Sequence, residues 1–340
     1  MLKKLKSNPI FKRTIDWAKL IGFTGTAQVV VQALGLLSGI FIIRMLSTEE
    51  YALYTLANTM LGTMVMLANA GIPVAVMAEG GKVWQDKEKL GEVLITGFDF
   101  RKKFAIGSLI IGIPILSYLL LKNGATISII IFITLALIPS FYAQLSNILL
   151  QIAPKLKQDI VPLQKNLVLV NLGRLVLLAL SLFIFPIAII AIFSATIPQV
   201  LGNLHLKKIT KNYADWKQKP SEELRGRMAG TVRRMLPDAI YYSISGQITI
   251  WILSIFGSTT SIAEIGALGR IAMILNLVSV IFSMLITPRF ARLVDSKNII
   301  LKRFIQAQII VVIIFCFFIT VVHFFPHQIL WFLGAKYANL

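Results

Sequence analysis

Long runs of apolar residues, separated by shorter polar segments, recur along the whole chain. A helix that spans a membrane needs about 20 predominantly apolar residues. The sequence predicts nine such spans, at 22–45, 51–78, 98–121, 126–152, 162–184, 187–206, 236–257, 264–288 and 304–325. We therefore expect an all-α fold, a polytopic transmembrane helical bundle.

The composition agrees with this pattern. Hydrophobic residues make up 56% of the chain and charged residues only 14%, whereas about 25% of the residues of an average soluble domain are charged. The single cysteine, Cys316, has no partner for a disulfide framework. These values exclude a disordered chain, a disulfide scaffold and a secreted globular enzyme, and they indicate an integral membrane protein.

The basic residues are distributed unevenly between alternate loops. The chain has 34 Lys and Arg residues and a formal net charge of +19, which alone would also suit a nucleic-acid-binding protein. If the N-terminus is cytoplasmic, 29 of them fall in inner segments and only Lys122 and Lys336 in outer ones, while Arg44, Arg174 and Arg270 lie within spans. The positive-inside rule then predicts a multi-pass protein with a cytoplasmic N-terminus. This asymmetry accounts for the charge, so we expect no nucleic-acid partner.

Two of the basic segments outside the spans suggest how the chain is organised. Residues 1–21 mix basic and apolar side chains, as an interfacial helix on anionic membrane lipids would. Residues 207–234 form the longest polar segment, which we interpret as a cytoplasmic linker. We expect a first lobe of six helices at 22–206 and a second lobe at 235–340 with three.

The second lobe begins like the first. In both, a span is followed by a short outer turn (LSTEEY and GSTTSIAE), a second span, a basic inner segment, and a span that starts at KKF or KRF. An internal repeat of this kind is common in transporters, where the substrate site lies at the repeat interface. The sequence therefore predicts two pseudo-repeated lobes around a central cavity, with the second lobe apparently incomplete.

Polar and small residues recur at helical spacing within four spans. Such stripes can serve helix packing, because small residues let helices approach and amides bond across the contact. Amides repeated over several turns on four helices are better explained by a water-filled cavity. The stripes are Thr24, Gln28, Gln32, Gly35 and Gly39; Thr55, Asn58, Thr59, Gly62 and Asn69; Ser140, Gln144, Asn147 and Gln151; and Asp238, Tyr242, Ser245 and Thr249.

Three of the arginines inside predicted spans are candidates for binding a ligand. Arg174, with Asn171 nearby on its helix, lies about 13 Å deeper than Lys165 at the helical rise per residue, close to the middle of the bilayer core. A lipid-facing arginine there costs about 3 kcal/mol. Arg270 is also inside its span, whereas Arg44 is near the outer surface, where snorkelling is an alternative to a role in binding. A guanidinium binds phosphate oxygens in a bidentate manner, so these arginines suit a pyrophosphate-bearing ligand.

Several segments resemble one transporter family. IIRMLSTEEYALYTLANTMLG, ANAGIPVAVMAE, GQITIWILSIFGS, GALGR, PRFARL and FLGAKYANL are similar to polysaccharide flippases of the Wzx type, in the multidrug/oligosaccharidyl-lipid/polysaccharide exporter superfamily. Such relatives usually have two lobes of six helices, and by that comparison about three helices are lacking here.

The resemblance implies a function as well as a fold. It implies transfer of a lipid-linked, undecaprenyl-pyrophosphate type of oligosaccharide from the inner to the outer leaflet of a prokaryotic plasma membrane. A polysaccharide polymerase or ligase is then an expected partner, and no cofactor is implied. We expect Arg174 and Arg270 to bind the anionic head group. The other expected substrate-binding residues are Arg44, Gln28, Gln32, Asn58, Gln144, Asn147 and Asn171.

A drug or cation antiporter of the same superfamily is the main alternative. It predicts a carboxylate deep in the first span, and residues 21–43 contain none. Asp238 and, more weakly, Glu79 are the candidates for coupling transport to an ion. For Asp238 the alternative is a simple ion pair with Arg234, four residues earlier.

An enzyme is the third hypothesis, and the motifs for it are incomplete. Glu49 and Glu50 could serve a membrane glycosyltransferase or ligase, but the outer loops are short and these residues more simply begin a helix. His323 and His327 are separated by Pro326 and have no third metal ligand nearby. The segment EGGK lacks the remaining positions of a phosphate-binding loop. We therefore expect neither catalytic residues nor a metal site.

Overall fold

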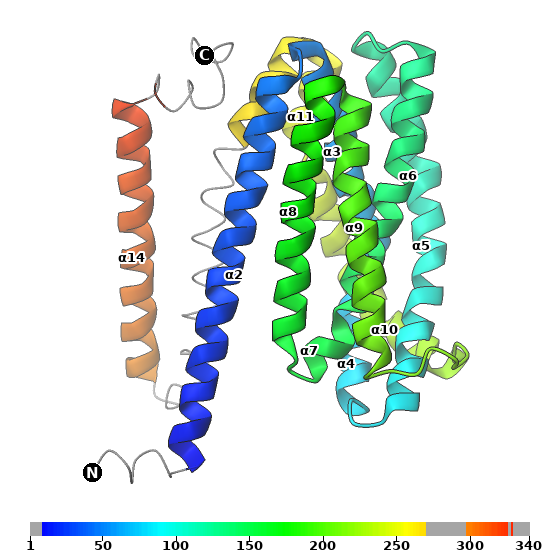
Figure 1. Cartoon of the computed structure of the whole chain (residues 1–340), viewed down its shortest axis with the longest axis vertical. Helices are drawn as coiled ribbons and strands as arrows, with labels where there is room; N and C mark the ends of the chain where they lie inside the picture. Colours follow the sequence, from blue (N-terminus) through cyan, green and yellow to red (C-terminus); the bar gives the residue numbers. More distant parts are fainter. Residues whose placement is uncertain (1–8, 270–296, 326–327, 329–340) are drawn as a thin grey trace. The chain divides into compact units, whose positions relative to one another are not determined.

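The computed structural model describes residues 9–269, 297–325 and 328, and every regular element in these ranges is an α-helix (Figure 1). The chain divides into two compact units. The first comprises Met1–Arg44 and Ala267–Leu340, and the second comprises Met45–Gly266.

The first unit contains two long described helices. α2 (Pro9–Met45) runs without a break from the basic segment into the first predicted span, so the described part of the expected interfacial segment, from residue 9, is helical and continuous with that span. α14 (Lys297–Phe324) covers the predicted span at 304–325 and begins seven residues before it. Both are long and apolar enough to cross a membrane.

The second unit is a bundle around α3. Its long helices α3, α5, α6, α8 and α9 run side by side (Figure 1), and α3 packs against α5, α6, α9 and α10. The elements are α3 (Thr48–Asn69), α4 (Ile72–Lys82), α5 (Lys87–Lys122), α6 (Ile127–Leu150), α7 (Ile152–Leu156), α8 (Ile160–Ile184), α9 (Ala188–Lys211), α10 (Glu222–Ser245) and α11 (Ile248–Phe256).

Two predicted spans are broken in the structure. The span at 51–78 is divided between α3 and α4 at Ala70 and Gly71, which have φ values of 37° and 81° in the left-handed region. The span at 236–257 is divided between α10 and α11, which are bent by 44°. An apolar run indicates burial or lipid contact but does not specify backbone direction, so neither break was predictable from hydropathy.

Seven described helices are long and apolar enough to cross a membrane, or eight if α10 and α11 form one span. The predicted span at 264–288 is helical over 264–269, and the rest of it lies outside the described residues.

The expected linker at 207–234 is mostly helical. α9 continues to Lys211 and α10 begins at Glu222, so only 212–221 is irregular. This connection is attached to α5, because the backbone N–H of Asp215 donates to the carbonyl of Lys87 at 2.9 Å. The division into lobes at 22–206 and 235–340 and the pseudo-repeat stay predictions.

Candidate functional site

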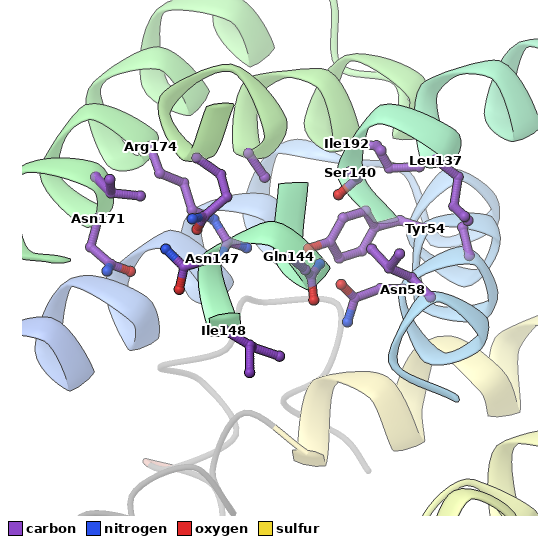
Figure 2. A pocket seen from close by; sticks show the side chains of 15 residues that line it. Tyr54, Asn58, Leu137, Ser140, Gln144, Asn147, Ile148, Asn171, Arg174 and Ile192 are labelled. Carbon is purple, nitrogen blue, oxygen red and sulfur yellow. The ribbon is translucent and has the colours of Figure 1, made fainter. Parts of the chain in front are cut away.

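A cavity of about 410 Å³ lies within the second unit, between α3, α6, α8 and α9. Figure 2 shows the side chains that line it. Half of its wall is polar. The polar residues are Tyr54 and Asn58 from α3, Ser140, Gln144 and Asn147 from α6, Asn171 and Arg174 from α8, and Gln199 from α9.

The local helix geometry explains why these side chains share one space. Ser140, Gln144 and Asn147 are spaced by four and three residues and therefore lie on one side of α6. Asn171 and Arg174 are related in the same way on α8. Because α6 and α8 both pack against α9, their polar sides can face the same cavity.

Arg174 carries a positive charge that nothing in the described part of the chain neutralises. Its Nε atom is buried and has no hydrogen-bond partner. The residues that line the cavity include no aspartate or glutamate, and no ion pair of Arg174 occurs among the described residues. An unpaired, partly desolvated charge is unfavourable, so this guanidinium favours an anion or water in the cavity.

An amide network supports one wall of the cavity. Nε2 of Gln151 donates to Oδ1 of Asn147 at 2.5 Å, and Nδ2 of Asn147 donates to Oδ1 of Asn203 at 3.0 Å. The same oxygen accepts from Nε2 of Gln199 at 3.1 Å, and Nδ2 of Asn203 donates to the carbonyl of Ala143 at 2.7 Å. Asn203 is 8% exposed. It therefore holds two cavity amides in place from behind.

Sequence reasoning did not single out Gln199 or Asn203. The signal was present, because Thr196, Gln199, Asn203 and Thr210 follow each other at helical spacing on α9. Pro198 and the basic residues at the end of the helix interrupt that pattern. The α9 stripe is thus a fifth polar face, and its Gln199 lines the cavity.

The structure brings five of the nine expected substrate-binding residues together. Asn58, Gln144, Asn147, Asn171 and Arg174 all line the cavity. Gln28, Gln32 and Arg44 belong to α2 in the first unit. Arg270 lies outside the described residues. That these nine residues contact a substrate remains a prediction.

The two expected ion-coupling residues lie away from the cavity wall. Asp238 is exposed on α10 and has no ion-pair partner among the described residues. The alternative pair with Arg234 is not formed, because Nε of Arg234 donates to the carbonyl of Gly230 at 3.2 Å. The rest of the Asp238 stripe on α10 and α11, namely Tyr242, Ser245 and Thr249, is exposed as well.

Glu79 is engaged in ion pairs at the basic end of the bundle. It pairs with Nζ of Lys82 at 2.6 Å and with Nε of Arg227 at 3.1 Å, and Arg227 also pairs with Glu223. The hydrogen bond from Lys82 is the main reason that the pKa of Glu79 lies below its ordinary value. Glu79 thus links α4 to α10 in the structure, and its coupling role stays a prediction.

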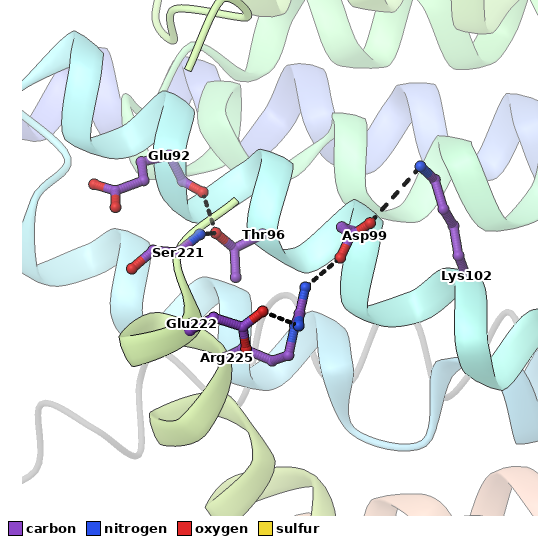
Figure 3. Close-up of polar contacts among 7 residues, drawn as sticks. All are labelled: Glu92, Thr96, Asp99, Lys102, Ser221, Glu222 and Arg225. Carbon is purple, nitrogen blue, oxygen red and sulfur yellow. Dashed lines mark hydrogen bonds and ion pairs between the residues drawn. The ribbon is translucent and has the colours of Figure 1, made fainter. Parts of the chain in front are cut away.

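A second ion-pair cluster ties α10 to α5 (Figure 3). Arg225 pairs with Asp99 and with Glu222, and Asp99 is 3.8 Å from Nζ of Lys102. Nearby, the N–H of Ser221 donates to Oγ1 of Thr96 at 2.9 Å. These contacts hold the start of α10 against the bundle.

Of the residues considered for enzymatic roles, Glu49 and Glu50 have structural roles at helix ends, and His327 lies outside the described ranges. Oε2 of Glu50 accepts from the N–H of Ala188 at 2.7 Å and so satisfies a free donor at the start of α9. Glu49 and Glu50 occupy the first turn of α3, whose N-cap is Ser47. His323 is in α14, whereas His327 is outside the described residues. The described ranges contain no group of three residues suited to a metal ion.

The comparisons with known proteins give a match in structure but not in sequence. No protein-family model matches the sequence, and no curated protein is significantly similar to it. A solved structure described as the inward-facing conformation of a multidrug resistance MATE family transporter of the MOP superfamily is similar with a TM-score of 0.64. The alignment covers 89% of this chain and 72% of that one, at 14% identity.

This likeness decides the fold. The chain is similar in fold to this transporter. Together with the apolar helices, it confirms the predicted all-α polytopic bundle and a multi-pass membrane protein. The finer resemblance to Wzx-type flippases, the plasma membrane location and the orientation of the N-terminus remain predictions.

Proposed function

We propose that the protein is a flippase that moves a lipid-linked oligosaccharide from the inner to the outer leaflet of a prokaryotic plasma membrane, for cell-surface polysaccharide synthesis. The observation that carries the proposal is Arg174, an arginine in a polar cavity whose described wall contains no carboxylate. A guanidinium binds phosphate oxygens through two parallel, charge-assisted hydrogen bonds. A lipid pyrophosphate supplies both the charge and the acceptors that Arg174 lacks.

The remaining polar wall suits the sugar part of such a substrate. Asn58, Gln144, Asn147 and Gln199 offer amide donors and acceptors from three helices. Sugar hydroxyls both donate and accept hydrogen bonds, so amides match them without adding charge. Asn203 keeps two of these amides oriented, which lowers the ordering cost on binding.

The cavity is less suitable for the substrate of the antiporter alternative. The structural neighbour is described as a multidrug resistance transporter. A cationic drug would lie beside the positive charge of Arg174, with no carboxylate on the described wall to offset it. For the enzyme alternative, Glu50 already has a structural contact, because it accepts a hydrogen bond from the start of α9.

The proposal can be tested by reconstituting the full chain in liposomes with a fluorescent lipid-linked oligosaccharide. Substitution Arg174→Ala should lower substrate affinity about tenfold to a hundredfold, the equivalent of one lost charge-assisted hydrogen bond. Arg174→Lys should be intermediate if charge suffices, and nearly as poor as alanine if bidentate bonding is required. Protein abundance should change little in both variants.

Arg233→Ala is the matched control, because Arg233 is an exposed arginine on α10 that does not line the cavity. It should transport like the unchanged protein. Normal transport per molecule in Arg174→Ala would disprove the role of the cavity arginine. Transport of a cationic dye but not of the lipid-linked sugar would favour the antiporter.

A further inference from the structure

A second hollow, of about 440 Å³, lies between α8 and α9 and is almost entirely apolar. We call it the α8/α9 groove. Leu169 and Val176 of α8 and Leu201 of α9 contribute apolar side chains to it, and all three are at least half exposed. In a membrane-spanning bundle, such a surface lies in contact with hydrocarbon.

Glycine at position 173 leaves the groove open. A Cβ atom there would lie 3.5 Å from Cβ of Pro198, which is an ordinary van der Waals contact, so helix packing does not require a glycine at this position. Gly202 differs, since a Cβ there would lie 2.1 Å from Cγ2 of Val170. The space at Gly173 is therefore available to something other than the two helices.

The groove adjoins the polar cavity. Val170 lines both hollows, and Gly173 of the groove directly precedes Arg174 of the cavity. One side of these turns of α8 could therefore contact the apolar chain of a lipid, and another side could contact its anionic head.

One end of the groove is polar and lies beside basic residues. Asn166 is only 4% exposed and brings a polar side-chain amide to this end of the groove. His205 lines the same end, and the exposed Lys165 and Lys208 are within one helical turn of these two residues in sequence.

We propose that the α8/α9 groove is a binding site for a single-chain lipid phosphate, with the hydrocarbon chain along the groove and the phosphate at Asn166 and His205. The inference rests on the proposed function, because the occupant is the carrier lipid of the flipped oligosaccharide. Lys165 and Lys208 add charge complementarity for the phosphate. A slot between two helices takes one chain, whereas a diacyl phospholipid leaves its second chain outside.

The site is a loading position for the substrate. Arg174 lies eight residues beyond Asn166 on α8, or about 12 Å further along the helix axis. The carrier phosphate first binds at the basic end of the bundle, where an inner-leaflet lipid presents it, and Arg174 receives it deeper in the cavity.

Photocrosslinking in the full-length protein tests this site. The photoreactive residue p-benzoylphenylalanine replaces Leu201 in the groove or, as the control, Leu180 on α8 outside it; these leucines are 61% and 63% exposed. The protein is placed in phosphatidylethanolamine and phosphatidylglycerol vesicles that contain a minor fraction of decaprenyl phosphate. We expect prenyl phosphate adducts, detected by mass spectrometry, at position 201 and phospholipid adducts at position 180.

Three variants establish where the lipid binds. Gly173→Leu fills the groove and should reduce the prenyl phosphate adduct at position 201 about tenfold, the effect of a modest loss of binding energy. Gly173→Ala, which the space tolerates, should leave it unchanged. Asn166→Leu should reduce the prenyl phosphate adduct while phospholipid adducts persist.

The outcomes separate this inference from the proposed function. Phospholipid adducts at both positions with no enrichment of prenyl phosphate would overturn the groove site, even if Arg174→Ala impairs transport. An unchanged adduct in Gly173→Leu would overturn it too. A selective prenyl phosphate adduct beside normal transport by Arg174→Ala would leave the groove site standing and remove the cavity mechanism. If Gly173→Leu does not accumulate, the comparison of adducts at positions 201 and 180 still decides whether the groove binds prenyl phosphate.

Discussion

Nη2 of Arg225 lies 2.5 Å from Oδ2 of Asp99, so the first turn of α10 is tied to the middle of α5 (Figure 3). The two side chains are 19% and 30% exposed, and Arg225 also pairs with Glu222. Lys102, by contrast, approaches Asp99 only to 3.8 Å and is 72% exposed. The polar connection between α9 and α10 is thus a packed, ion-paired part of the bundle.

Arg225→Ala should therefore destabilise the protein by about 1 to 2 kcal/mol, between the values typical of an exposed ion pair and of a hydrogen bond to a charged group. Lys102→Ala should cost much less, because its pair with Asp99 is long and exposed. The apparent melting temperature in detergent measures both effects. Equal shifts for the two variants would contradict the importance of the Arg225 contact.

The pH dependence of stability should include a contribution from Glu79. Its pKa in the folded protein is lowered from the ordinary 4.5, chiefly by the hydrogen bond from Lys82. The folded state then favours the carboxylate, so this contribution is fully present above pH 4.5 and is lost as the pH falls through the lowered pKa.

The variant Glu79→Gln checks the sign of this effect. It should be less stable than the unchanged protein near neutral pH, and the two melting temperatures should converge on acidification below pH 4.5. A difference that stays constant with pH would show that Glu79 acts through packing alone.

Two glycines with nearly the same φ should respond differently to alanine. Gly71 has φ 81° and Gly124 has φ 85°. A Cβ on Gly71 would lie 2.7 Å from Cβ of Met235, whereas one on Gly124 would meet nothing within 4 Å. Gly124→Ala should cost about 1 to 2 kcal/mol through backbone strain alone. Gly71→Ala should add about 1 to 3 kcal/mol of overpacking between α4 and α10.

Membrane abundance and apparent melting temperature measure this difference. Equal costs at the two positions would mean that α10 can shift away from the turn between α3 and α4. The break of the predicted span at 51–78 would then depend on the backbone and not on its contact with Met235.

The topology can be tested by cysteine labelling in a background that lacks Cys316. Lys217 lies in the connection before α10 and Ser258 follows α11, so the bent pair of helices separates them. Cysteines at these positions should react with an impermeant reagent from opposite sides of the membrane, with Lys217 on the cytoplasmic side. Labelling of both from one side would mean that α10 and α11 form a re-entrant segment.

Hydropathy alone determined that the protein is an all-α membrane bundle and placed most of its helices well. α8 begins at Ile160 where the sequence predicted 162, and α9 begins at Ala188 where it predicted 187. This worked because a bilayer requires each spanning helix to be apolar over its own length, whichever neighbours it has. The same local reasoning identified Asn58, Gln144, Asn147, Asn171 and Arg174, since helical periodicity places polar residues on one face.

Tertiary structure decided which polar faces meet. Polar residues of α3, α6 and α8 converge on one cavity while the stripe at Asp238 remains exposed, and Asn203 connects two cavity amides from behind. It also decided where apolar runs break, because the turn at Gly71 depends on a left-handed backbone and on contact with α10. Sequence periodicity describes one helix at a time. Pockets, unpaired charges such as Arg174 and grooves such as that between α8 and α9 are properties of several helices packed together.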